Sequence, residues 1–146
     1  ASFAEVVVHT LTGEPRDLRA DLVQDCGRTL NPAIDRGQIE GAFVQGQGWL
    51  TCEELYWDEQ GRQRTLGPST YKIPGSRDAP PDFRVRLLAA VPARQATIFR
   101  SKAVGEPPLM LATAVWNALI DATGVARLDL PATPERVLLA LRAKGS

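Results

Sequence analysis

The sequence has few of the residue types that usually carry metal or disulfide chemistry. Its 146 residues include two cysteines, Cys26 and Cys52, and a single histidine, His9. Two cysteines are too few for a disulfide framework or a self-contained zinc site, and one histidine cannot form a metal cluster alone. We therefore expect a chain from a reducing compartment, the cytoplasm. Any metal chemistry would need a cofactor that is held mostly by something else.

An excess of charge of one sign and a long apolar run are also missing. Seventeen Lys and Arg residues balance seventeen Asp and Glu residues, so the formal net charge is zero. No basic surplus exists to drive non-specific binding to nucleic acid or to an anionic membrane. No run of about 18 apolar residues could span a bilayer, and the first residues do not follow a signal-peptide pattern. We expect neither nucleic acid nor a membrane as a partner.

What the sequence does contain is an ordinary globular composition. Hydrophobic residues make up 44% of the chain and charged residues 23%, which is typical of a folded protein. A chain of this length buries roughly 70% of its unfolded surface without disulfides or metals. We expect residues 1–146 to form a single domain. The chain begins inside a strand pattern with no polar lead-in, which suggests a fragment of something larger.

Alternating hydrophobicity predicts the strands. The valine-rich residues 3–9 and the alternating residues 18–22 predict an antiparallel hairpin across a turn at residues 12–15. Residues 53–66 predict two short strands around a turn, and residues 83–91 predict another strand. Between them, residues 67–82 are rich in proline and glycine. We expect these residues to form an ordered loop across the surface, with Tyr71 and Ile73 as apolar anchors.

Helical periodicity predicts two main helices and a short third one. The first covers residues 35–51, with Asp35 as its candidate N-cap, and the second covers residues 107–123 and is apolar on nearly every side. Thr133 caps a last helix that begins with a proline. The predicted fold class is α+β, with a mixed or antiparallel sheet covered by the two main helices.

The first predicted helix has two different faces. Ile39, Phe43, Gly46 and Leu50 form a stripe suited to packing on a sheet, whereas Gln38, Gly41, Gln45 and Gly48 form a stripe of amides and glycines. Each glycine costs a helix about 1 kcal/mol relative to alanine, so close approach of backbone or of a ligand is the usual reason for its presence. The stripe could bind a planar polar ligand. From the pattern alone, tight helix–strand packing with solvated glutamines is favoured over ligand binding.

The most informative short motif is Gly105-Glu106-Pro107-Pro108. A residue before proline is pushed out of the helical region, so we expect Glu106 to be held extended beside a helix start. A carboxylate held at the rim of an apolar helix is a candidate general base. The alternative is a helix-end charge or cap, paired with Lys102, and the pattern alone favours this structural role.

Three strings in the sequence resemble one family. They are NPAIDRGQIEGAFVQG at residues 31–46, GPSTYKIP at residues 67–74 and SKAVGEPPL at residues 101–109. They resemble the molybdopterin-binding part of xanthine dehydrogenases, which belong with aldehyde oxidases to the molybdenum hydroxylases. Within this family, the strings most resemble those of bacterial xanthine dehydrogenases. The strings occur in the family's order and span most of residues 3–123. The resemblance implies the fold of the C-terminal part of a molybdopterin-binding domain.

The resemblance also implies a chemistry. By similarity, Glu106 matches the family's catalytic glutamate, which takes the proton of a metal-bound hydroxide as that oxygen attacks an electron-poor ring carbon. Gln38 matches a glutamine that hydrogen-bonds the pterin of the molybdenum–molybdopterin cofactor, in favour of the ligand-binding interpretation of its stripe. Electrons would leave through iron–sulfur clusters and FAD, on other domains or subunits, to an acceptor such as NAD. The whole enzyme would oxidise hypoxanthine or xanthine.

Most of the family's contacts to the cofactor and the purine come from residues N-terminal to this chain. We therefore expect the isolated chain to be inactive and to hold no molybdenum. Its implied partners are the remaining domains of the molybdenum subunit and the iron–sulfur/FAD subunit. Two alternatives stay open: another molybdenum hydroxylase, such as an aldehyde oxidase or N-heterocycle dehydrogenase, or a cofactor-free scaffold or interaction module in which Glu106 is only a helix-end charge.

Overall fold

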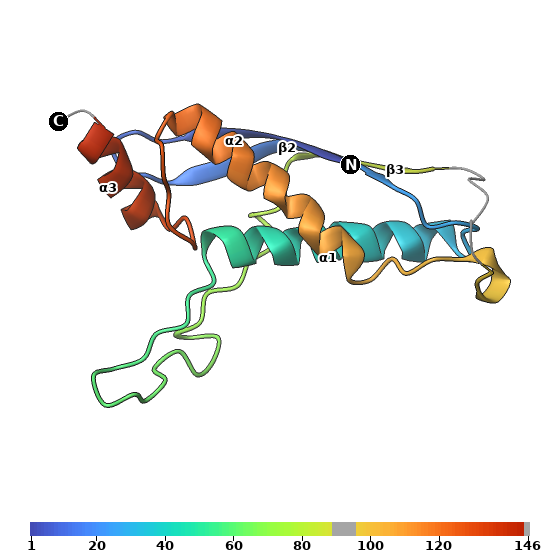
Figure 1. The fold of residues 1–146 in the computed structure, drawn as a ribbon, viewed down its shortest axis with the longest axis horizontal. Coiled ribbons are helices and arrows are strands. Elements are labelled where there is room, and N and C mark those ends of the chain that lie inside the picture. Colours follow the sequence, from blue (N-terminus) through green and yellow to red (C-terminus); the bar gives the residue numbers. More distant parts are fainter. Residues whose placement is uncertain (89–95, 145–146) are drawn as a thin grey trace.

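A computed structural model describes residues 1–88 and 96–144, and it contains a small mixed sheet with helices on one face (Figure 1). The strands are β1 (Ser2–Val8), β2 (Pro15–Gln24) and β3 (Asp82–Leu87), in the order β1-β2-β3. β1 and β2 pair antiparallel, whereas β2 and β3 pair parallel. The α+β class and the mixed sheet predicted from the sequence are confirmed. A parallel pair needs a crossover connection, and the long segment between β2 and β3 supplies it.

The predicted hairpin is confirmed, but it contains an irregularity that the alternation did not predict. Ala4 lies opposite Ala20 and Glu5 opposite Arg19, yet Val6 lies opposite Asp17, so Leu18 has no partner. An extra residue of this kind is a β-bulge, and it reverses which side chains face inward beyond it. Asp17 is therefore buried and Leu18 is 37% exposed.

Helix α1 (Pro32–Thr51) begins three residues earlier than predicted, and Asp35 is not its cap. The side-chain oxygen of Asn31 accepts hydrogen bonds from the backbone N–H groups of Ala33 and Ile34, at 3.1 and 3.3 Å. Proline fits the first helical position because its missing N–H would have no partner there. The Asn-Pro pair therefore starts the helix, and Asp35 in its first turn accepts a hydrogen bond from the Thr29 hydroxyl.

The predicted second main helix is two elements. Residues 107–112 form the 3-10 segment η2 (Pro107–Ala112), and helix α2 (Thr113–Thr123) follows it directly. Two leading prolines remove two N–H donors, so a tight 3-10 start costs little there. The last helix, α3 (Pro134–Lys144), begins as predicted after Thr133, whose hydroxyl accepts from the backbone N–H of Arg136. A further short 3-10 turn, η1 (Ile98–Arg100), precedes η2.

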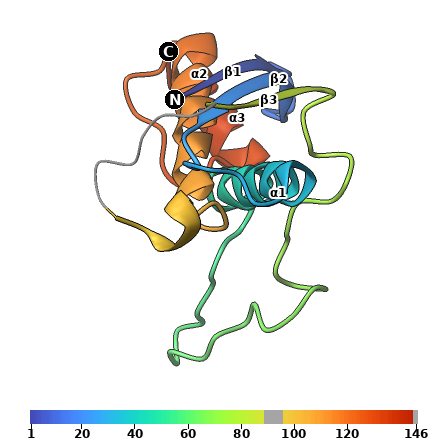
Figure 2. The same cartoon turned by 90° about the vertical axis from the view of Figure 1, so that its right-hand side faces the viewer.

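The helices cover one face of the sheet, with α1 and α2 crossing beneath it (Figures 1 and 2). Side chains from this face of the sheet and from all three α-helices form one core. Its members include Ala20, Leu22, Val85, Ile39, Phe43, Val115, Leu119 and Val137. The stripe of Ile39, Phe43, Gly46 and Leu50 is buried as predicted. The sheet and the two main helices therefore form the compact body that positions the site.

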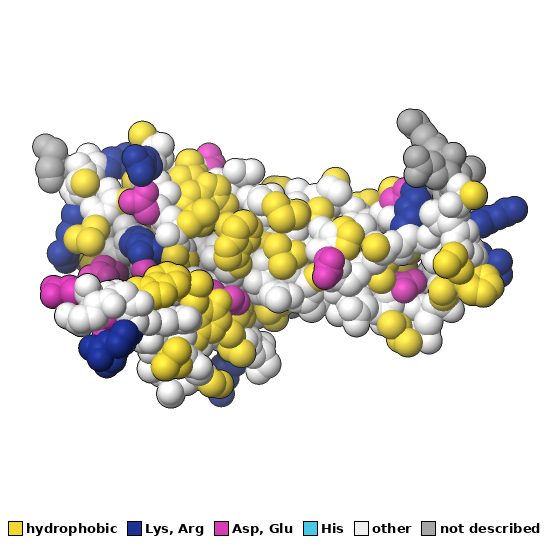
Figure 3. Space-filling view, turned by 60° about the horizontal axis from the view of Figure 1, so that its bottom comes forward, with side chains coloured by type: hydrophobic (Ala, Val, Ile, Leu, Met, Phe, Trp, Pro, Cys, Tyr) yellow, Lys and Arg dark blue, Asp and Glu magenta, His cyan; other side chains and the backbone are white. Residues whose placement is uncertain are grey.

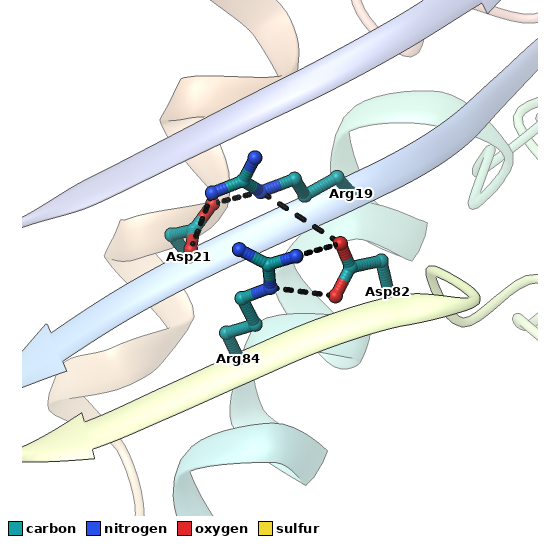
Figure 4. A network of polar contacts seen from close by, with 4 residues as sticks. All are labelled: Arg19, Asp21, Asp82 and Arg84. Carbon is teal, nitrogen blue, oxygen red and sulfur yellow. Dashed lines mark hydrogen bonds and ion pairs between the residues drawn. The ribbon is translucent and has the colours of Figure 1, made fainter.

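The other face of the sheet carries charged pairs (Figure 4). Arg19 pairs with Asp21 at 2.5 Å, and Arg84 pairs with Asp82 at 2.6 Å. Arg19 also lies 3.9 Å from Asp82 across the parallel strands. Exposed pairs of this kind contribute little stability individually, but they place complementary charges across the β2–β3 register.

The strands predicted within residues 53–66 are absent. Trp57 and Gln63 form a single isolated bridge around the predicted turn. Residues 53–73, called the arm below, instead project away from the body (Figure 2). The Tyr71 hydroxyl donates to Glu53 at 2.6 Å and closes the base of the arm. Tyr71 therefore anchors this segment through a polar contact and not an apolar one as predicted, and Ile73 is 55% exposed. Among the described residues, the arm has no neighbouring strand to hydrogen-bond with and no core to cover, so its alternating residues do not form strands.

The strand predicted at residues 83–91 is confirmed as β3, and its last three residues lie outside the described residues. Within residues 1–88 and 96–144, no helix has the length and apolar character to cross a bilayer.

Candidate functional site

The site region is built where η2 crosses α1. A methyl group at Gly46 would lie 2.3 Å from the backbone oxygen of Leu109 and 2.8 Å from the Ala112 side chain. Such distances are too short for any carbon, so the crossing requires a residue without a side chain. Gly46 therefore sets how closely the segment that starts with Glu106 approaches the helix that carries Gln38.

The chain before Glu106 is tied to the end of β2. The Lys102 ammonium group lies 2.5 Å from the Asp25 carboxylate, and the Lys102 N–H donates to the Cys26 carbonyl at 2.9 Å. The hydrogen bond from Lys102, aided by one from the Gly27 N–H, lowers the pKa of Asp25. Lys102 is thus paired with Asp25, and the predicted alternative of a Lys102–Glu106 pair is wrong.

Glu106 lies at the start of η2 in a conformation that differs from the prediction. Its φ and ψ are −100° and −41°, in the right-handed helical region and not extended. The carbonyl of Glu106 accepts a hydrogen bond from the Leu109 N–H at 3.0 Å, and this turn offsets the crowding that a following proline causes. The side chain makes no capping bond and is exposed, and it has no hydrogen bond or ion pair with any other described residue.

Gln38 lies on the exposed face of α1, next to this turn. A methyl group added at Gly105 would lie 3.3 Å from Gln38 Oε1. Glu106 is the next residue along, so its backbone lies at the same edge of the molecule as Gln38, although the two residues are far apart in sequence. The Gln38 amide likewise makes no hydrogen bond within the described part of the chain.

The glycine stripe is only partly as predicted. Gln38, Gly41 and Gln45 are exposed along α1, and no atom lies within 4 Å of a methyl group added at Gly41. Gly48 is buried instead, and the Pro74 ring packs so closely against it that an added methyl group would lie 2.4 Å from that ring. Gly48 therefore serves chain packing, as the structural interpretation predicts, whereas the part of the stripe near Gln38 is open.

This edge offers an amide and a carboxylate without competing partners. The amide can donate to and accept from a planar heterocycle, and the carboxylate can accept a proton. No group of three His, Cys, Asp or Glu side chains in the described ranges could hold a metal ion. Cys26 and Cys52 are both free thiols, and Cys26 is buried whereas Cys52 is half-buried. The side chains of this edge can therefore supply hydrogen bonds and a proton acceptor.

Sequence reasoning missed the residues that bring the site together. Gly46 was assigned to the buried stripe, but its role in the crossing of η2 over α1 depends on a segment sixty residues later. The Asp25–Lys102 pair also joins distant positions, and a single sequence carries no signal for it. For Gly105, the Gly-Glu-Pro-Pro motif could have indicated the close packing against Gln38, because a glycine often lies where another group approaches the backbone closely.

The sequence profile of the molybdopterin cofactor-binding domain matches residues 1–80, more than half of the chain. The chain belongs to this family. The matched range contains Gln38 and the Gly46 crossing point. The fold and the family expected from the three motifs are therefore confirmed.

Individual proteins agree with the family. The chain is 50% identical over 146 residues to "Xanthine dehydrogenase/oxidase" of Rattus norvegicus, with 92% of this chain covered. This coverage necessarily includes Gln38 and Glu106. The chain spans about 11% of the length of that relative.

Solved structures give the same result. The quinoline 2-oxidoreductase from Pseudomonas putida 86 is 30% identical, with a TM-score of 0.82 over 94% of this chain and 18% of that chain. The aldehyde oxidoreductase from Desulfovibrio gigas is 31% identical, with a TM-score of 0.79 over 95% of this chain and 15% of that chain. The fold is therefore that of a section of a molybdenum hydroxylase.

Proposed function

We propose that this chain forms part of the active site of a molybdenum hydroxylase of the xanthine dehydrogenase type. In this proposal the complete enzyme hydroxylates hypoxanthine or xanthine with oxygen derived from water. Glu106 is the general base, and Gln38 hydrogen-bonds the pterin of the cofactor. The proposal is supported by the 50% sequence identity to the rat protein named xanthine dehydrogenase/oxidase and by the match to the molybdopterin cofactor-binding domain family.

One observation carries the assignment of the two residues. Gly105 approaches Gln38 Oε1 so closely that an added methyl group would lie 3.3 Å away. The backbone of the following residue, Glu106, therefore lies at the same edge as Gln38, and neither side chain hydrogen-bonds to a described residue. An unpaired amide beside an unpaired carboxylate fits a heterocyclic cofactor on one side and a proton-donating reactant on the other.

The side chains of this edge would divide the work as follows. The Gln38 amide orients the pterin through its N–H donors and its oxygen. When bound, the molybdenum cofactor would supply the two-electron redox chemistry. A carboxylate oxygen of Glu106 accepts the proton that the attacking oxygen loses, and it holds that proton until release to solvent. The crossing at Gly46 and the Asp25–Lys102 pair keep the two side chains at one edge.

The complete enzyme requires partners beyond this chain. We propose that the remaining domains of the molybdenum subunit supply the other contacts to the cofactor and to the purine. Iron–sulfur clusters and FAD on other domains or subunits would carry the electrons away, with NAD as the acceptor. We place this enzyme in the cytoplasm, in keeping with its two free thiols.

The test is Glu106→Gln in the complete enzyme. The amide keeps the shape of the side chain but cannot accept the proton, so kcat should fall by about 10²–10⁴-fold. Molybdenum content, measured by elemental analysis, should stay at the wild-type level. Glu135→Gln in the first turn of α3 is the matched control, and it should leave kcat unchanged.

The outcomes separate the alternatives. If Glu106→Gln keeps full activity, Glu106 is a helix-end charge and the chain serves as a scaffold or interaction module. If Glu106→Gln is inactive, Glu106 acts in catalysis. The kcat/KM values of the wild-type complete enzyme on xanthine, on quinoline and on an aldehyde then decide the substrate. The structural similarity to a quinoline oxidoreductase and an aldehyde oxidoreductase makes these the relevant competitors, and a higher kcat/KM for either would contradict the purine assignment.

A further inference from the structure

A second candidate site lies at the other end of α1, away from Gln38. A pocket of about 550 Å³ is lined by the start of β2, the end of α1, the returning side of the arm and the start of α3. Gln47 of α1 lines this pocket. Gln47 lies nine residues after Gln38 on the same helix, which separates the two positions by about 14 Å along the helix axis. A pocket of this size suits a small molecule or a single long side chain.

The wall of the pocket contains a carboxyl group without a partner. Asp17 is 6% exposed, its Oδ2 is fully buried, and neither of its oxygens hydrogen-bonds to any described residue. The bulge at Leu18 causes this burial, because it turns Asp17 to the inner side of β2. Burying a carboxyl group without a hydrogen bond is costly, so such groups in proteins normally have a partner.

A second unsatisfied oxygen lines the same pocket. Gln47 is 7% exposed, and its Nε2 donates to the backbone oxygen of Asp78 at 2.7 Å. This bond fixes the amide, and its Oε1 is left buried without a hydrogen bond. The unsatisfied atoms of Asp17 and Gln47 are both acceptors. When Asp17 is ionised, a group that completes both atoms has to donate hydrogen bonds, and a positive charge on it matches the carboxylate.

We propose that this pocket binds an alkylammonium group, with Asp17 and Gln47 Oε1 as its acceptors. The group belongs either to a free primary amine or to a lysine side chain from polypeptide outside residues 1–146. The proposal is independent of the proposed function, because it uses neither Gln38 nor Glu106.

The affinity should depend on pH. Burial raises the pKa of Asp17 to about 7 in the empty pocket, and an ammonium ion binds the ionised form. Between pH 6 and pH 8 the affinity should therefore rise about tenfold, since proton release is linked to binding. Burial also raises the pKa of the Cys52 thiol, so this thiol stays neutral in that range. The titratable and charged groups that line the pocket besides Asp17 are Glu14, Arg16, Cys52, Lys72, Arg77 and Asp78.

The experiment is a calorimetric titration with n-propylammonium chloride, on this chain and on the complete polypeptide that carries it. Asp17→Asn should weaken binding by about 10–100-fold, because a charge-assisted hydrogen bond is lost. Asp129→Asn changes an exposed aspartate that pairs with Arg127 outside the pocket and should have no effect. Propan-1-ol has no charge and tetramethylammonium has no N–H donor, and both should bind at least tenfold more weakly.

The two preparations distinguish the sources of the ammonium group. Binding to both indicates a free amine. Binding to this chain alone, with a lower Tm for Asp17→Asn in the complete polypeptide, indicates a lysine side chain already in place. The proposal is overturned if wild type and Asp17→Asn bind the amine equally, or if neither preparation binds it and Asp17→Asn leaves the Tm of the complete polypeptide unchanged.

Discussion

At the scale of single residues, the position of a side chain relative to a strand irregularity decides its chemistry. Asp17 and Asp21 lie on the same strand. Asp21 pairs with Arg19 on the outer face, and the hydrogen bond from Arg19 lowers the pKa of Asp21. Asp17 lies beyond the bulge, without a partner among residues 1–88 and 96–144, and burial raises its pKa to about 7. Two identical residues four positions apart therefore have opposite pKa shifts.

This difference predicts how stability depends on pH. The pKa of Asp17 is higher in the folded than in the unfolded chain, so the folded state binds more protons between pH 4 and pH 7, and stability falls as pH rises through this range. Asp17→Asn removes the ionisation. In the absence of an amine, it should stabilise the chain by roughly 2–4 kcal/mol at pH 8 and have little effect near pH 4.

Urea unfolding of the wild type and of Asp17→Asn at several pH values checks this prediction. Asp129→Asn, an exposed aspartate, serves as the control and should show no such trend. A stability difference between wild type and Asp17→Asn that stays constant from pH 4 to pH 8 would contradict the raised pKa of Asp17.

At the scale of elements, two glycines of the same helix have opposite roles. A methyl group at Gly46 would collide with the Leu109 carbonyl oxygen at 2.3 Å, whereas one at Gly41 meets nothing within 4 Å. Gly46→Ala should therefore destabilise the chain by about 1–3 kcal/mol through overpacking. Gly41→Ala should stabilise it by about 0.5–1 kcal/mol, because alanine favours a helix. Thermal unfolding of the two variants measures both effects, and a stabilising Gly46→Ala would show that η2 does not cross α1 this closely.

The elements also show which kind of pattern a sequence can resolve. The hairpin, α1 and α3 were predicted because their own caps, turns and periodicity define them. The strands predicted in the arm are absent, since Trp57 and its neighbours alternate like a strand but have no sheet to join. Asn31 rather than Asp35 caps α1 because the competing N-cap positions differ by a few residues, and only the backbone geometry selects one.

At the scale of the whole molecule, the described part of this chain offers only two side chains to the proposed cofactor. The edge with Gln38 and Glu106 is exposed, and the chain spans about 11% of its rat relative. Large apolar side chains of the arm and of η1 are exposed as well, where hydrophobic side chains gather on the surface (Figure 3). These are Leu55, Tyr56, Trp57, Leu66, Ile73, Ile98 and Phe99. Two side chains at an open edge make too few contacts to hold a large cofactor against its loss of freedom.

We therefore expect this chain, expressed alone, to be purified without molybdenum and without hydroxylase activity. Elemental analysis of the purified chain measures the first, and a xanthine oxidation assay measures the second. Stoichiometric molybdenum in the chain alone would contradict the expectation. The complete polypeptide, prepared in the same way, is the positive control.

The sequence by itself determined the family and the α+β class, because these depend on short motifs and periodic patterns that are fixed locally, and it also supplied the two residues of the proposed catalytic edge, Gln38 and Glu106, which stay predictions. The tertiary structure alone decided that Gly105 packs beside Gln38, that Lys102 pairs with Asp25, and that Asp17 is buried. Each of these depends on which distant segments meet, and on a single unpaired residue in β2 that no local pattern marks. Burial and pairing are properties of the assembled chain, and from them follow the pKa of Asp17 and the pocket that it lines.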